Sequence, residues 1–129
     1  MTARRDRGEI SVMMMVLLVV VLAGAALVVD GGRAMSARRH ASNVAEAAAR
    51  AGVSTATPAA PFDPVEARRA ALDHAVRAGV PVADVDVTVT PDAVRVTVRE
   101  HRRSVFLVLG GVSTLDVRAT GVARVVFSG

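Results

Sequence analysis

Residues 10–29 have the sequence ISVMMMVLLVVVLAGAALVV, and this apolar segment decides the architecture of the chain. Ser11 is its one polar side chain, and none of its residues is charged. At about 1.5 Å per residue, a helix of this length spans roughly 30 Å, the thickness of the hydrocarbon core of a bilayer. Twelve of the residues are Ile, Val or Leu, and together they contribute about −4 to −7 kcal/mol to insertion. The segment predicts a transmembrane helix.

Two other structures are compatible with an apolar run. A cleaved signal peptide has a shorter apolar core and a small-x-small cleavage site, whereas residues 30–33 here are DGGR. A buried core helix is normally shorter and has more polar residues. Three arginines precede the segment and three follow it closely, so the basic residues leave its orientation nearly undecided. We expect a single-pass protein of the cell membrane, with residues 1–9 as a cytoplasmic leader and the C-terminal part outside the cytoplasm.

The composition beyond the anchor describes a small basic domain. The chain has 129 residues and a formal net charge of +4; every basic residue is arginine, and thirteen arginines and nine acidic residues follow residue 30. Aromatic residues make up only 2%, too few for the stacking platforms that bind nucleic acid. The chain has no cysteine, which excludes disulfides and thiolate metal sites. An anionic polymer of the cell envelope and membrane lipid remain compatible partners for the basic surface.

Residues 30–52 predict an alanine-rich helix that extends from the membrane. Low helix propensity at residues 30–32 allows either a hinge or a softened helix there. Small apolar residues recur at steps of three and four from residue 31 to residue 51, with Gly24 seven residues earlier, as in a helix-packing interface: Gly24, Gly31, Ala34, Ala37, Ala41, Val44, Ala48 and Ala51. Such a seam permits close helix approach but offers little apolar area per residue. It packs either on the sheet of its own domain or laterally against copies of itself and related subunits, and both alternatives stay open.

Residues 63–129 predict a small α+β head domain, joined to the helix by a linker at 53–62. Asp63 is a helix N-cap followed by Pro64, and Glu66 completes a capping box. The helix is expected to end near Ala78. Its apolar face is predicted to contain Val65, Leu72, Ala75, Val76 and Val80.

Alternating valines predict an antiparallel hairpin at 85–98 with a turn at 90–93. With Val89 opposite Val94, the register also places Asp84 opposite Arg99 as an ion pair. A third strand follows, and its inward residues are Leu115, Val117, Ala119, Gly121, Ala123, Val125 and Phe127. The predicted fold class is therefore α+β, with a long N-terminal transmembrane helix and a second helix packed on a three-stranded antiparallel sheet, as in pilins.

Five consecutive large apolar residues lie between the second and third strands: Val105, Phe106, Leu107, Val108 and Leu109. They form either an inner strand or short helix, or an exposed patch that docks to a partner or the membrane surface.

No residue pattern typical of catalysis occurs in the chain. The histidines His40, His74 and His101 are too far apart for a local metal pair. Asp84 and Asp86 lack the further ligands of a calcium loop. The sequence has neither a Gly-x-Ser-x-Gly elbow nor a phosphate-binding glycine loop. We therefore expect a protein that is not an enzyme and uses no cofactor, metal or small-molecule substrate.

Three stretches together resemble a known family. They are RGEISV at 7–12, VDGGR at 29–33 and AEAAARA at 45–51. The combination, with the apolar run between them, resembles the TadE/TadG-like proteins of Tad (tight adherence, or Flp) pilus assembly. The composition, rich in Arg and Ala, is similar to that of actinobacterial proteins. The resemblance implies a minor pilin or pseudopilin-like subunit whose partners are other pilus subunits.

The resemblance also points to a candidate leader-peptidase site at Gly8 and Glu9. Processed Tad pilins are cut after a Gly and carry a Glu five residues later, whereas this chain has Met13 at that position. The difference favours a subunit that keeps its leader and stays in the membrane.

Overall fold

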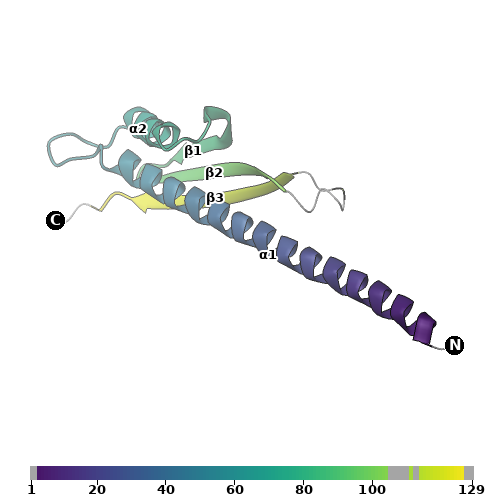
Figure 1. Ribbon diagram of the computed structural model, residues 1–129. Coiled ribbons are helices and arrows are strands. Elements are labelled where there is room, and N and C mark those ends of the chain that lie inside the picture. Colours follow the sequence, from purple (N-terminus) through teal and green to yellow (C-terminus); the bar gives the residue numbers. More distant parts are fainter. Residues whose placement is uncertain (1–2, 105–110, 112–113, 127–129) are drawn as a thin grey trace.

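The computed structural model describes residues 3–104, 111 and 114–126, with side chains from residue 8 onward. Its elements are α1 (Ala3–Val53), α2 (Pro64–Arg77), the short 3-10 helix η1 (Val82–Asp84), β1 (Val85–Val89), β2 (Ala93–Arg103) and β3 (Thr114–Arg124). Figure 1 shows α1 as one long helix whose N-terminal half projects alone from a head formed by all the other elements. The predicted α+β class with a long apolar N-terminal helix is confirmed.

Helix α1 continues without a break through Gly31 and Gly32, so of the two alternatives for residues 30–32 the hinge is not formed. Each glycine costs roughly 1 kcal/mol in a helix interior relative to alanine. Asp30, at the start of this weak turn, is buried and accepts a hydrogen bond from Ser104 Oγ at 3.0 Å. This contact joins the turn to the end of β2 and so holds α1 to the head.

The three strands form an antiparallel sheet in the order β1-β2-β3. Val89 lies opposite Val94 and Val85 opposite Val98, which confirms the predicted register. The turn is closed by the N–H of Thr90, which donates to the carbonyl of Ala93 at 2.8 Å. In β3 the predicted inward residues between 115 and 123 are all less exposed than their neighbours in the strand. Val125, just past the strand, follows the same alternation. Phe127 lies outside the described residues.

The predicted pair between Asp84 and Arg99 is wrong. Asp84 ends η1 and precedes the first residue of β1, so it lies outside the strand ladder. Its carboxylate instead contacts Nε2 of His101 at 3.2 Å.

The second half of α1 lies across the valine face of the sheet and forms the core with it (Figure 1). Val94, Val96 and Val98 are fully buried there, together with alanines of α1 such as Ala45. A Cβ placed on Gly121 would lie 2.5 Å from the carbonyl oxygen of Ala45 and would also meet the backbone of Glu46. Helix and strand backbones are therefore in direct contact, and only residues without bulky side chains fit between them.

Helix α2 packs against α1 and β1, and Asp63 is its N-cap as predicted: Oδ1 of Asp63 accepts from the N–H of Val65 at 2.9 Å. The hydrogen bond by which Glu66 would complete a capping box is not among those of the described residues. The predicted apolar face is wrong in part, because Val65 and Val76 are exposed. The side chains buried on α2 are those of Ala67, Ala71 and Ala75, spaced four residues apart. Small side chains allow the two helices to approach closely, so burial here follows side-chain size more than hydrophobicity.

Candidate functional site

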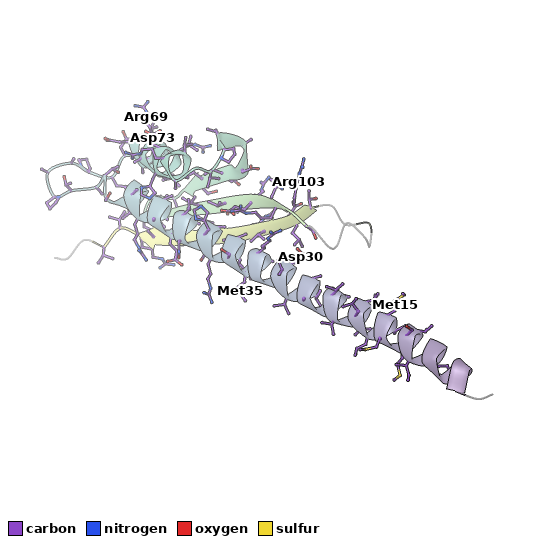
Figure 2. The ribbon with its side chains drawn as sticks, viewed as in Figure 1. Met15, Asp30, Met35, Arg69, Asp73 and Arg103 are labelled. Carbon is purple, nitrogen blue, oxygen red and sulfur yellow. The ribbon has the colours of Figure 1, made fainter. Side chains whose placement is uncertain are left out.

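Among the described residues, the large side chains of the apolar segment of α1 are exposed, although Ala26 near its end is buried. Leu17 and Leu22 are each 58% exposed, and the neighbouring valines are exposed to a similar degree. Figure 2 shows this half of the helix, with Met15, well away from the head. It is the one helix in the described part of the chain that is long and apolar enough to cross a membrane. Because a core helix would be buried, that alternative is excluded, and the chain is membrane-anchored through α1.

The alanine seam divides into two groups. Four of its members, Ala37, Ala41, Val44 and Ala48, are buried inside the head of the same chain. This is the first of the two packing alternatives, and it leaves these four side chains no surface for a partner helix. Ala51 and Ala34 are half-buried, while Gly24 and Gly31 are exposed, so a lateral contact there stays a prediction.

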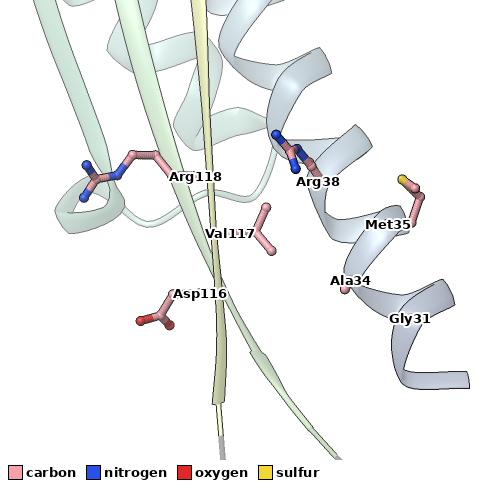
Figure 3. Close-up of a pocket in the computed structure, with 7 residues that line it drawn as sticks. All are labelled: Gly31, Ala34, Met35, Arg38, Asp116, Val117 and Arg118. Atoms are coloured by element: carbon pink, nitrogen blue, oxygen red, sulfur yellow. The ribbon is translucent and has the colours of Figure 1, made fainter. Parts of the chain in front are cut away.

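Exposed glycines and apolar residues continue along one flank of α1. We use the term flank stripe for Gly24, Val28, Gly31 and Met35, which recur at steps of four, three and four and so share a face. Val28 and Met35 are 74% and 56% exposed. The C-terminal end of the stripe, nearest the head, borders a groove between α1 and β3. The groove is lined by Gly31, Ala34, Met35, Arg38, Asp116, Val117 and Arg118. In Figure 3 Val117 points toward α1, whereas Asp116 and Arg118 point to the other side of β3.

Two further predicted sites stay untested. The apolar patch at 105–109 lies outside the described residues. Gly8 and Glu9 lie within α1 on its exposed surface, and a Cβ on Gly8 would meet no atom within 4 Å.

A chain of polar contacts on the outer face of the sheet was not predicted. Nδ1 of His101 lies 2.6 Å from Oδ1 of Asp116, and Nε2 lies 3.2 Å from Oδ1 of Asp84. His101 and Asp116 are direct partners in the ladder of β2 and β3, so a register for the third strand could have revealed the first contact. The hydrogen bond with Asp116, and then that with Asp84, raise the pKa of His101 above its ordinary 6.5.

We expect the head to lose stability as the pH rises from below 6.5 through the raised pKa of His101. The raised pKa of His101 means that its protonated form stabilises the folded state; this contribution is complete below pH 6.5 and disappears as the pH passes the folded-state pKa. His101→Gln should remove the pH dependence of the urea midpoint, measured by pulse proteolysis. His101 and Asp84 line a pocket whose other charged or titratable residues are His40, Arg99, Glu100 and Arg102. His74→Gln, on α2, is the matched control, and an unchanged pH profile in His101→Gln would contradict the assignment.

The outer face of the sheet also carries arginines on adjacent strands. Arg95, Arg99, Arg118 and Arg124 are all exposed, and Arg99 lies directly opposite Arg118 in the ladder. Like charges in such a position destabilise a sheet. In the part of the chain that is described, none of these four side chains takes part in an ion pair. Nor do the described residues contain a group of three His, Cys, Asp or Glu able to hold a metal ion.

Comparison with known proteins identifies the N-terminal part. Residues 8–57 match the family described as Flp pilus-assembly TadE/G-like. The matched region contains the exposed apolar segment, the flank stripe and most of the alanines that pack in the head. No curated protein and no solved structure matches the chain. The N-terminal helix that anchors the chain is therefore similar to that of the TadE/G-like proteins of Tad (Flp) pilus assembly.

Proposed function

We propose that this protein is a minor pilin or pseudopilin-like subunit, a structural component that acts through lateral packing of α1 with other pilus subunits in the membrane. One observation carries the proposal: the helix matched by the pilus-assembly family extends beyond the head domain, and the large apolar side chains of this extension are exposed. The burial of Ala37, Ala41, Val44 and Ala48 in the head moves the proposed contact to the flank stripe, where two glycines allow a second helix to approach closely.

The proposal includes an intact leader and a head outside the cytoplasm. Glu9 directly follows Gly8, and the position where processed pilins carry a carboxylate is Met13. A subunit that keeps residues 1–8 stays in the bilayer and serves assembly from there. Mass spectrometry of the protein from membranes should therefore show the full N-terminal sequence, and a start at Glu9 would favour a filament subunit instead.

Site-directed crosslinking tests the lateral contact. The sequence contains no cysteine, so single substitutions can carry a thiol-linked photoreactive group without background. Gly24→Cys and Val28→Cys, on the flank stripe, should crosslink to other pilus components in membranes of cells that assemble pili. Leu22→Cys is the matched control, because Leu22 is also exposed but lies on the opposite side of the helix. Equal crosslinking at all three positions, or none to pilus components, would refute packing through this face.

The arginines on the sheet favour a second candidate function, a membrane-tethered module that binds an anionic polymer of the cell envelope. The opposition of Arg99 and Arg118 costs stability in the free protein and would be relieved by a bound polyanion. The double substitution Arg99→Gln with Arg118→Gln separates the two functions in the same cells. Lateral packing predicts normal piliation and normal crosslinks at Val28→Cys, whereas polymer binding predicts normal crosslinks and lost function.

A further inference from the structure

Where α1 enters the head, three guanidinium groups border one pocket. We call it the arginine pocket; its lining residues are Arg33, Ser36 and Ala37 from α1 and Arg102 and Arg103 from the end of β2. Figure 2 places Asp30 on α1 and Arg103 at the end of the strand above it. The contact between Ser104 and Asp30 fixes this end of β2 against the helix, so the pocket is a defined feature of the fold.

The charges around the pocket leave it strongly cationic. Within the described residues, neither Arg33 nor Arg103 forms an ion pair. Nη2 of Arg102 donates to Oε2 of Glu100 at 3.2 Å, and its side chain remains 55% exposed. Of the nearby carboxylates, Glu100 also contacts His40 at 3.4 Å and Asp30 is bound by Ser104. Two guanidinium groups are thus available to an anion, and a third can turn toward it.

The position of the pocket along α1 indicates its depth relative to the bilayer. Val29 is the last residue of the uninterrupted apolar segment, and Arg33 follows four residues later. Four residues of helix rise about 6 Å, while the polar layer on each side of the hydrocarbon core is roughly 5–8 Å thick. Because Ser104 contacts Asp30, Arg102 and Arg103 lie near the same level. The arginine pocket therefore falls within the layer that contains lipid phosphates.

We propose that the arginine pocket binds the phosphate of an anionic phospholipid in the adjacent leaflet. Guanidinium groups match the geometry of phosphate oxygens and can donate two hydrogen bonds to them, and the hydroxyl of Ser36 is a further donor. The acyl chains of such a lipid would lie along the exposed apolar side chains below Val29. Binding fixes the height of the head above the membrane. The inference rests on the membrane anchorage in the proposed function, but not on lateral packing.

Native mass spectrometry of the full chain, purified in detergent, tests the inference with phosphatidylglycerol and phosphatidylcholine as probes. The wild type should retain phosphatidylglycerol in preference to phosphatidylcholine. The double substitution Arg33→Gln with Arg103→Gln should weaken phosphatidylglycerol binding about 30-fold, since each arginine near an anionic surface contributes about 1 kcal/mol and 1.4 kcal/mol is tenfold. The matched control, Arg69→Gln with Arg77→Gln, makes the same charge change at exposed positions on α2 and should bind like the wild type.

Three results would overturn the inference: equal retention of both lipids, unchanged binding in the double variant, or an equal loss in the control. Glycerol phosphate tests the source of the anion; if it binds as tightly as the lipid, the pocket takes a soluble phosphate and not a phospholipid. Pulse proteolysis checks folding, and if the double variant is unfolded, Arg33→Gln alone gives the same comparison with about a 5-fold loss. If the wild-type protein is absent from the membrane fraction, the proposed function is contradicted. If the protein is in the membrane fraction but shows no preference between the two lipids, only the lipid-binding inference is contradicted.

Discussion

Gly121→Ala is expected to destabilise the head by about 3 kcal/mol or more. The added methyl group would lie 2.5 Å from the carbonyl oxygen of Ala45 and against the backbone of Glu46. These are backbone atoms of a helix, so they cannot rotate away as a side chain could, and α1 must separate from β3. Small domains are stable by only about 5–15 kcal/mol, so much of the stability would be lost. Pulse proteolysis in urea measures the effect in detergent-solubilised protein.

The same substitution at Gly31 is the matched control. A Cβ there would meet nothing within 4 Å, and alanine in a helix interior is favoured over glycine by roughly 0.5–1 kcal/mol. Gly31→Ala should therefore leave the urea midpoint unchanged or raise it slightly. If Gly121→Ala behaves like Gly31→Ala, the close contact between α1 and β3 does not exist in solution.

Replacing Val19 and Val20 by arginine is expected to abolish membrane anchorage. Each arginine at the centre of a transmembrane helix costs about 2.5–3.5 kcal/mol, and each valine removed contributed about −0.3 to −0.6 kcal/mol. The double substitution therefore costs about 6–8 kcal/mol, which offsets the whole insertion energy of about −4 to −7 kcal/mol. The wild type should remain in membranes after a carbonate wash, and the variant should be soluble or degraded.

Val82→Arg with Val122→Arg provides the control, since both valines are exposed on the head, at 59% and 49%. This variant makes the same chemical change outside the apolar segment and should stay in the membrane fraction. Retention of the variant with arginines at 19 and 20 would show that α1 is held by something other than its own hydrophobicity.

The hairpin of β1 and β2 shows how well a local pattern can define a fold. Its register was predictable because six valines alternate with polar residues around a Pro-containing turn, and a slip by one residue would bury charges. The buried face of α2 was less predictable. Large side chains such as Val65 suggested one face, yet the neighbouring helix required small side chains and selected Ala67, Ala71 and Ala75 instead.

The sequence by itself determined the membrane anchor, because insertion depends on the summed hydropathy of consecutive residues and needs no contact with the rest of the chain. It also determined the strands and the N-cap at Asp63, which depend on neighbours a few residues apart. Only the tertiary structure decided that the head covers four residues of the alanine seam, that His101 lies between Asp84 and Asp116, and that Arg33 lines one pocket with Arg102 and Arg103. Each of these contacts joins segments far apart in sequence, so it depends on how α1 crosses the sheet, which no local pattern specifies.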